Sequence, residues 1–168
     1  YNVTIFAGNF ETLFVGWEFL GITSFLLIAF YRDRYLPVKN ALKTISLYRL
    51  GDICLMLALW TSHHIWNENI TFAKLENAEL VTSHIAGNYA SVIFLISMII
   101  IAASIKSAQF PFSSWLPRAM EGPTTSSAVF YGSLSVHLAV FLLMRTHNYW
   151  ESIGLIKMII IIMGVCTA

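Results

Sequence analysis

An apolar run that ends in a lysine constrains this chain more than any other feature. Residues Val92–Ile105 are almost wholly apolar, Lys106 follows them, and Pro111 comes five residues later. Proline has no amide hydrogen and its ring clashes with the carbonyl four residues earlier, so we expect a helix to break here. A broken helix is tolerated inside a membrane only where its freed backbone is buried in protein or lines a wet cavity. Because a charge in the bilayer core costs about 2.5–3.5 kcal/mol, Lys106 is a candidate functional residue.

The composition is that of a membrane protein. Hydrophobic residues make up 57% of the 168 residues and charged residues 11%, whereas soluble domains carry about 25% charged residues. The net charge of +1, without a basic run, gives no indication of nucleic-acid binding. The two cysteines lie far apart inside apolar runs and indicate neither a disulfide framework nor a metal site. We therefore expect an all-α, polytopic transmembrane helix bundle in the lipid bilayer, with no metal or cofactor held by this chain.

Four apolar spans and a partial fifth are predicted within a single membrane domain over residues 1–168. The predicted spans are 11–31, 44–61, 89–115 with a break near 106–111, 124–144, and a partial span from 153. A full crossing needs about 20 apolar residues, and the last run is shorter than that. The chain also starts without a methionine. We therefore expect it to be an excerpt of a larger protein.

Loop charges predict the orientation of these spans. The loop between the first two spans contains four basic residues and one aspartate, whereas the next loop contains three glutamates and one lysine. The positive-inside rule places the first loop on the cytoplasmic side or its organellar equivalent. Alternation then returns Arg118 to that inner side, within the Pro- and Gly-rich segment Trp115–Pro123, which is predicted to be an interfacial connector.

Two carboxylates are predicted at membrane depth. Glu18 lies about 12 residues, or roughly 18 Å, from the inner end of its span. Such a carboxylate marks an ion pathway, or alternatively an ion pair that locks two helices together. Asp52 lies in the second span, and Arg49 is three residues earlier on the same face, a spacing at which opposite charges meet. That pair is either part of a pathway or a local structural partnership.

A histidine extends the set of polar residues at membrane depth. His137 falls in the fourth span, with Ser133 one turn before it. The unperturbed pKa of histidine suits proton relay near neutral pH, although a hydrogen bond to Ser133 would be an ordinary packing solution. Together with Glu18, Asp52 and Lys106, this residue predicts a proton pathway across four successive spans. We expect Lys106 and Glu18 to form its central charge pair.

Several motifs resemble those of a known family. The motifs are Gly16–Glu18, Arg49–Asp52, Lys106–Phe112, Trp115–Pro117 and Ala119–Thr124. In this order they are similar to the signature of the antiporter-like subunits of respiratory NADH–quinone oxidoreductase, with subunit L the most similar. The resemblance extends over nearly the whole chain, and the joint occurrence of the motifs is specific. It implies a fragment of a bundle built from two inverted five-helix repeats, each with a discontinuous helix.

The resemblance also implies roles for individual residues. Glu18 matches the glutamate of the family's fifth helix, Asp52 the aspartate of the sixth, and Lys106 the lysine at the break in the seventh. The family is thought to use these residues for proton translocation. The implied partners are other membrane and peripheral subunits of a larger complex, in a bacterial plasma membrane or a mitochondrial inner membrane. The implied activity is that of a translocase subunit without its own redox centre.

Three positions depart from the usual pattern of subunit L. Arg118 stands where an acidic residue is usual, Thr125 where a proline is, and Tyr131 where a histidine is. His137 is not a simple replacement for that histidine, because six residues turn a helix by about 600°. The departures indicate a diverged branch and leave other functions open. These are a membrane subunit that energises inorganic-carbon uptake with a zinc carbonic-anhydrase-like partner, a cation/proton antiporter subunit, and a structural scaffold.

Overall fold

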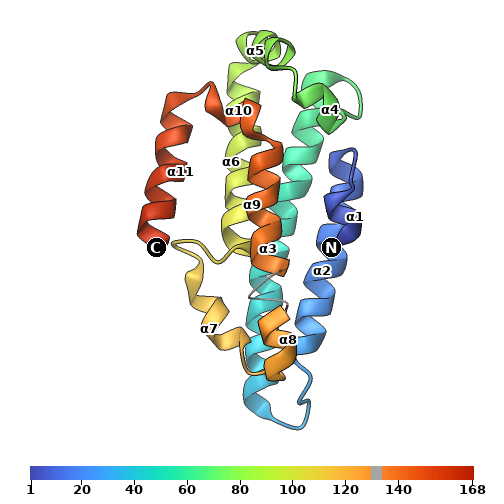
Figure 1. Cartoon of the computed structure of the whole chain (residues 1–168), viewed down its shortest axis with the longest axis vertical. Coiled ribbons are helices and arrows are strands. Elements are labelled where there is room, and N and C mark those ends of the chain that lie inside the picture. The colour runs from blue at the N-terminus through green and yellow to red at the C-terminus, as the bar shows by residue number, and fades with distance from the viewer. Residues whose placement is uncertain (130–133) are drawn as a thin grey trace.

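The molecule is elongated, with its longer helices lying side by side (Figure 1). The structure is a computed structural model that describes residues 1–129 and 134–168. Its elements are α1 (Asn2–Ile5), α2 (Phe10–Ile28), α3 (Tyr35–Trp66), α4 (Phe72–Leu75), α5 (Ala78–Gly87), α6 (Tyr89–Lys106), the 3₁₀ helix η1 (Ser113–Trp115), α7 (Leu116–Ala119), α8 (Thr124–Val129), α9 (Ser135–Arg145), α10 (His147–Glu151) and α11 (Gly154–Thr167). The part of the chain that the structure describes contains no β-strand, which confirms the predicted all-α class.

Helix α2 shows how the sequence suits a membrane. The side chain of Asn9 caps its start by accepting a hydrogen bond from the Thr12 amide at 2.9 Å. The buried face of the helix includes Leu13, Trp17, Leu20 and Ser24. The exposed face carries Val15, Phe19, Ile22 and Leu26. A stripe of large exposed apolar side chains is unfavourable in water but suits lipid. Among the described helices, α2 and α6 are each long and apolar enough to cross a bilayer.

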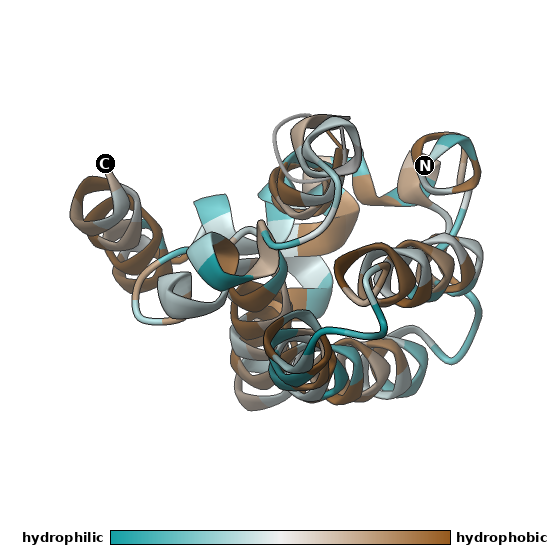
Figure 2. Ribbon diagram, turned by 90° about the horizontal axis from the view of Figure 1, so that it is seen from below, coloured by the Kyte–Doolittle hydropathy of each residue, from teal (hydrophilic) through white to brown (hydrophobic). Residues whose placement is uncertain are grey.

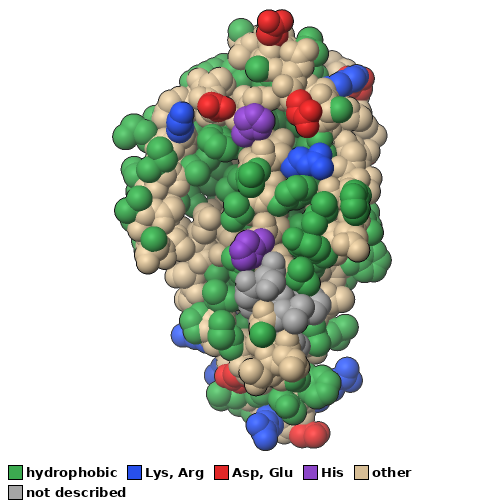
Figure 3. Space-filling model, viewed as in Figure 1, with side chains coloured by type: hydrophobic (Ala, Val, Ile, Leu, Met, Phe, Trp, Pro, Cys, Tyr) green, Lys and Arg blue, Asp and Glu red, His purple; other side chains and the backbone are tan. Residues whose placement is uncertain are grey.

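Helix α3 is longer than the predicted span 44–61. Its 32 residues extend over about 48 Å, which exceeds the roughly 30 Å of bilayer hydrocarbon. Its first turns lie beside α7, and its last turns lie near α4 and α5 (Figure 1). The basic loop between the first two predicted spans and the connector Trp115–Pro123, which contains Arg118, therefore lie at the same end of the bundle. This end is called the inner end below, and the loop charges predicted that the two segments share it. On the face shown in Figure 3, charged side chains gather towards the two ends, with hydrophobic side chains between them.

Helix α6 ends about midway along α3 (Figure 1), and the predicted break is confirmed. The amide of Gln109 bonds to the carbonyl of Ser104 at 2.9 Å, and the amide of Ala108 bonds to the carbonyl of Ile105 at 3.3 Å. Ala108 has a φ of 53°. These two bonds form a Schellman motif, in which glycine is the usual residue at the position of Ala108. The helix therefore stops at Lys106, before it reaches Pro111.

The segment after the break keeps its backbone satisfied without continuing as a long helix. The indole of Trp115 donates a hydrogen bond to the carbonyl of Ile105 at 2.9 Å, so a carbonyl freed by the break has a second partner. Pro111 follows a cis peptide bond. The short helices η1 and α7 come next, so the predicted third span, 89–115 with a break near 106–111, consists of α6 up to Lys106 and the 3₁₀ turn η1 at its end.

The last two predicted spans contain helices where the structure describes them. The region predicted as one span, 124–144, contains α8 and α9 on either side of residues 130–133. The candidate residues Tyr131 and Ser133 lie outside the described residues. Helix α11 begins at Gly154, where the partial fifth span was predicted, and stands at the edge of the bundle seen from below (Figure 2).

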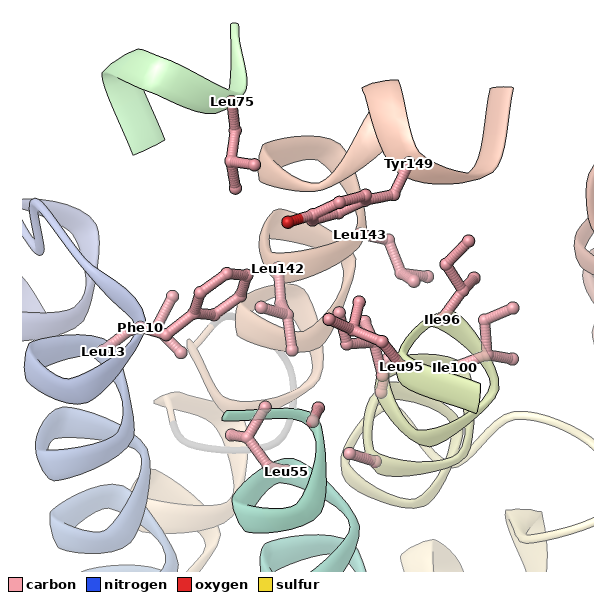
Figure 4. Packing of buried hydrophobic residues seen from close by; sticks show 14 of the residues in the cluster. Phe10, Leu13, Leu55, Leu75, Leu95, Ile96, Ile100, Leu142, Leu143 and Tyr149 are labelled. Atoms are coloured by element: carbon pink, nitrogen blue, oxygen red, sulfur yellow. The ribbon is translucent and has the colours of Figure 1, made fainter. Parts of the chain in front are cut away.

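The buried apolar side chains form two clusters. The larger lies towards the outer end and includes Leu13, Leu55, Leu95 and Leu142 (Figure 4). The smaller lies towards the inner end and consists of Ile28, Ala41, Tyr48, Ile105, Ala108, Trp115 and Ala119. Lys106 lies where they meet, because its ammonium is over the ring of Trp17 from the first cluster and that of Tyr48 from the second.

Candidate functional site

Lys106 is the most buried charge of the site, with 1% of its surface exposed. Its ammonium donates a hydrogen bond to the backbone carbonyl of Trp17 at 3.2 Å. It also lies 5.1 Å from the centroid of the Trp17 ring and 4.4 Å from that of Tyr48, within the range of cation–π attraction. No carboxylate in the described part of the chain lies within 4.0 Å of this ammonium. A carbonyl and two aromatic rings therefore solvate Lys106.

A glycine provides the space for this ammonium. Gly21 lies one turn after Trp17 on α2, and a Cβ atom placed there would lie 3.1 Å from Nζ of Lys106. The same atom would lie 3.7 Å from Cδ2 of Tyr48. Helix α2 thus approaches Lys106 closely at Gly21, and a side chain there would crowd the ammonium.

Trp17 connects Lys106 to a carboxylate. While its backbone carbonyl accepts from Lys106, its indole N–H donates to Oδ1 of Asp52 at 3.0 Å. Asp52 is itself buried, with 5% of its surface exposed. The sequence reasoning missed Trp17 as a site residue, although its position next to Glu18 in a predicted span was a signal that could have identified it.

Arg49 holds the two carboxylates of the site together. Its Nη1 lies 2.8 Å from Oε2 of Glu18 and 3.5 Å from Oδ2 of Asp52. The contact between Arg49 and Asp52, predicted from their spacing, is confirmed. The expected direct pair of Glu18 with Lys106 is wrong, because Glu18 bonds to Arg49 instead.

Helix geometry explains this difference. Glu18 and Trp17 are neighbours on α2, and neighbouring residues of a helix point about 100° apart. Trp17 points into the core, where it meets Lys106, and is 1% exposed. The side chain of Glu18 points further outward and is 21% exposed, beside the 49% exposed side chain of Arg49. Equal depth in the membrane therefore did not bring Glu18 and Lys106 into contact.

His137 does not join this cluster. It lies on the exposed face of α9. The face that packs in the bundle consists of Ser135, Leu138, Ala139, Leu142 and Leu143. The expected place of His137 beside the other pathway residues is therefore not found, and its role in proton transfer stays a prediction.

The charges of the site are balanced. Lys106 and Arg49 carry two positive charges, and Glu18 and Asp52 carry two negative charges. When Lys106 loses a proton, this group acquires a net charge of about −1 and attracts a new proton in its low-dielectric surroundings. The arrangement is therefore chemically suited to taking up and releasing one proton at a time.

Known proteins with similar sequence and structure identify the family. Residues 7–168 match the family model described as "NADH:quinone oxidoreductase/Mrp antiporter, TM". The chain is 33% identical to NADH-ubiquinone oxidoreductase chain 5 of Yarrowia lipolytica over 165 residues, which cover 98% of this chain and 24% of that protein. It is 37% identical to the protein of the same name from Petromyzon marinus, with 97% and 26% covered. The chain thus spans about a quarter of the length of these curated relatives.

A solved structure supports the same assignment. The Mrp complex from Dietzia sp. DQ12-45-1b matches with a TM-score of 0.76 and 28% identity, over 86% of this chain and 15% of that one. The expected antiporter-like membrane fold is therefore confirmed, and the chain is part of an integral membrane protein. With its family match and its broken helix at Lys106, the chain belongs to the transmembrane family shared by NADH:quinone oxidoreductases and Mrp antiporters.

Proposed function

We propose that the chain is part of a proton-translocating membrane subunit of a complex I-like assembly, with Lys106 as its central proton carrier. The observation that carries this proposal is the burial of Lys106 at a helix break in the middle of the bundle. Ionisable residues in such positions are costly in a membrane and mark ion pathways. Membership of a family whose description names oxidoreductase and antiporter subunits supports the same function.

The partners of Lys106 suit a residue that changes its charge. Its hydrogen bond is to the carbonyl of Trp17 and not to a carboxylate, so loss of the proton does not leave an unpaired carboxylate beside it. Arg49 lies between Glu18 and Asp52. A shift of Arg49 from Glu18 towards Asp52 would weaken the attraction between Asp52 and Lys106 and favour proton release, because nearby charges stabilise or destabilise the charged form.

Other subunits supply what this chain does not. The side chains of Arg49 and Glu18 are partly exposed about midway along α2, where lipid tails would solvate them poorly. We propose that a neighbouring membrane subunit covers this face. This role needs no cofactor in this chain, and the energy that moves the proton comes from elsewhere in the assembly.

A second candidate function is cation/proton antiport. The structural match to an Mrp complex favours it, since antiporters are named in the family description. In that case Lys106 would still carry the proton, and a metal cation would cross in the opposite direction.

Proton transport by the full-length assembly in liposomes, read with a pH-sensitive dye, tests the proposal. Lys106→Met keeps a long side chain and removes the charge, so transport should be lost while the assembly stays intact. Lys74→Met, at an exposed lysine paired with Glu68, is the control and should transport normally. Wild-type transport by Lys106→Met would show that the proposed function is wrong. A requirement for Na⁺ or K⁺ on the opposite side would favour antiport.

A further inference from the structure

We infer that protons reach Lys106 from the inner end of the bundle along a buried polar stripe on α3, with Glu121 as their uptake site. The polar stripe consists of Asn40, Thr44, Tyr48 and Asp52. This inference rests on the proposed function and extends it to Asn40, Thr44, Tyr48 and Glu121, to which the charged site of Glu18, Arg49, Asp52 and Lys106 assigns no role.

The members of the polar stripe lie on one face of one helix. They are spaced four residues apart, and side chains at this spacing lie one above the other on a helix. All are buried, with exposed fractions of 8% for Asn40, 1% for Thr44, 1% for Tyr48 and 5% for Asp52. Twelve residues of helix extend over about 18 Å. The stripe therefore leads from near the inner end of α3 to the level of Lys106.

Glu121 lies at the inner end of the polar stripe. The side-chain amide of Asn40 donates a hydrogen bond from Nδ2 to Oε1 of Glu121 at 2.6 Å. Glu121 follows α7, in the connector that the sequence placed at the membrane surface. A carboxylate at this position can take a proton from the inner aqueous phase, and Asn40 holds it at the start of the stripe.

A cavity reaches two members of the polar stripe. It has a volume of about 540 Å³ and is lined by Asn40 and Thr44 and by three basic residues, Lys39, Lys43 and Arg118. The positive charges disfavour a free cation in this cavity. Proton uptake therefore needs an anionic acceptor nearby, and Glu121 lies one hydrogen bond away from the lining residue Asn40.

Tyr48 lies between this cavity and Lys106. Trp115 lines the cavity and packs edge-on against Tyr48, with ring centroids 5.0 Å apart. On its other side, the Tyr48 ring lies 4.4 Å from the ammonium of Lys106. The hydroxyl of Thr44 donates to the carbonyl of Asn40 at 2.9 Å, so its oxygen can still accept from water. One turn of helix rises about 6 Å between Thr44 and Tyr48, a gap that bridging water can close.

On the outer side of Asp52, an apolar layer interrupts the buried polar residues of α3. The buried residues that follow Asp52 on α3 are Cys54, Leu55 and Ala58, and the buried polar residues Thr61 and Ser62 lie further out. Leu55 lies in the larger apolar cluster with Leu13, Leu95 and Leu142 (Figure 4). In the described part of the chain, this cluster closes the outer side of α3 above Lys106. The uptake path and the release path must therefore differ.

Each transfer along this path conserves protons and charge. The Glu121 carboxylate accepts a proton from hydronium or a buffer acid and passes it to water in the cavity, which restores the carboxylate. The hydroxyls of Thr44 and Tyr48 each accept one proton and release another, so they end unchanged. In the last transfer, a water passes the proton from the Tyr48 hydroxyl to the neutral amine of Lys106 and forms its ammonium.

The test uses three variants of the full-length assembly in liposomes, each with a matched control. Thr44→Val, Tyr48→Phe and Glu121→Gln remove one proton-transferring group each and nearly preserve shape. Thr23→Val and Tyr31→Phe make the same changes at exposed positions, and Asp33→Asn likewise turns an exposed carboxylate into an amide. Because positioned proton-transfer groups have large effects on rate, we expect the first three to slow proton transport by about tenfold or more. The controls should stay at the wild-type rate.

A structural role for Glu121 predicts a different result. Glutamine can still accept the hydrogen bond from Asn40, so Glu121→Gln keeps the contact and removes only the proton acceptor. Loss of transport in Glu121→Gln, with recovery in Glu121→Asp, supports proton uptake by this residue. Normal transport in Glu121→Gln, with failure in Glu121→Ala, would show that Glu121 only fastens the connector and would overturn the inference.

Lys106→Met in the same assay separates the two proposals. If Lys106→Met is inactive while Thr44→Val, Tyr48→Phe and Glu121→Gln all transport normally, the uptake path is wrong and the proposed function stands. If Lys106→Met transports normally, the proposed function itself is wrong.

Discussion

The carbonyl oxygen of Trp17 lies 3.2 Å from the ammonium of Lys106 across the interface of α2 and α6. The same tryptophan donates its indole N–H to Asp52 on α3 at 3.0 Å. One residue therefore links three helices at the depth where α6 breaks. The contact with Lys106 uses a backbone carbonyl, which a side-chain substitution at Trp17 leaves in place. The contact with Asp52 uses the indole side chain, so a substitution at Trp17 can test it directly.

Replacing Trp17 by Phe should separate these two contacts. The ring over Lys106 remains, but Asp52 loses a hydrogen-bond donor in a buried place. A hydrogen bond to a charged group typically contributes about 1.5–3 kcal/mol. We expect a lower thermal unfolding midpoint in detergent and slower proton transport. Trp60→Phe is the control, since Trp60 is 67% exposed, and equal midpoints for the two variants would contradict the role of the Trp17–Asp52 bond.

Arg49 should couple Glu18 energetically to Asp52. Its guanidinium contacts both carboxylates, and residues in one ion-pair network typically show coupling energies of about 0.5–3 kcal/mol. A double-mutant cycle with Glu18→Gln and Asp52→Asn should therefore be non-additive in unfolding midpoint and in transport rate. The cycle of Glu18→Gln with Lys106→Met, which are not in contact, should be closer to additive in stability. Additive effects in the first cycle would contradict the shared role of Arg49.

The spans were predictable because hydropathy reports what lies in lipid. It located α2 and α6 closely, but it predicted 44–61 for a helix that runs over Tyr35–Trp66. The additional turns contain residues such as Lys39 and His64, which are polar and helical beyond the hydrocarbon. A helix outside lipid leaves no hydropathy signal, so its ends could not be predicted by this means.

The charged residues of the site were predictable one by one, whereas their pairing was not. Depth follows from position along a span, but contact also depends on the rotation of each helix about its axis. That rotation directs Glu18 to Arg49 and places His137 on an exposed face of α9. The polar stripe could have been found, because Asn40, Thr44, Tyr48 and Asp52 follow one another at four-residue intervals in the sequence.

Ala108 should respond to glycine differently from an alanine inside α6. Its φ of 53° is a left-handed conformation that costs a residue with a side chain about 1–2 kcal/mol. Ala108→Gly relieves that strain and loses one buried methyl group, so stability should change little. Ala102→Gly, at an equally buried position inside α6, should destabilise by about 1 kcal/mol. Unfolding midpoints measure both, and an equal loss in the two variants would contradict the Schellman motif at the break.

Tyr149 should make stability depend on pH in the alkaline range. Burial raises the pKa of its phenol to about 12, and Trp66 donates a hydrogen bond to its oxygen at 2.7 Å. The unfolded phenol has a pKa of about 10, so the folded state keeps the proton longer than the unfolded state does. Its contribution to stability is present below pH 10 and falls as the pH rises towards 12. Tyr149→Phe should reduce the slope of unfolding midpoint against pH in this window, and an unchanged slope would contradict the prediction.

Gly122 should be intolerant of any side chain. A Cβ atom there would lie 2.6 Å from the carbonyl oxygen of Leu27 at the end of α2, so Gly122→Ala forces the connector away from that helix. Overpacking of this kind costs about 1–3 kcal/mol. Because Glu121 is the preceding residue, the shift should also disturb its hydrogen bond to Asn40 and slow proton transport.

Gly164→Ala is the control, since nothing lies within 4 Å of a Cβ there. In a helix, that change should be neutral or stabilising by up to about 1 kcal/mol. Unfolding midpoints and transport rates that agree between the two variants would show that α2 and the connector are not in close contact.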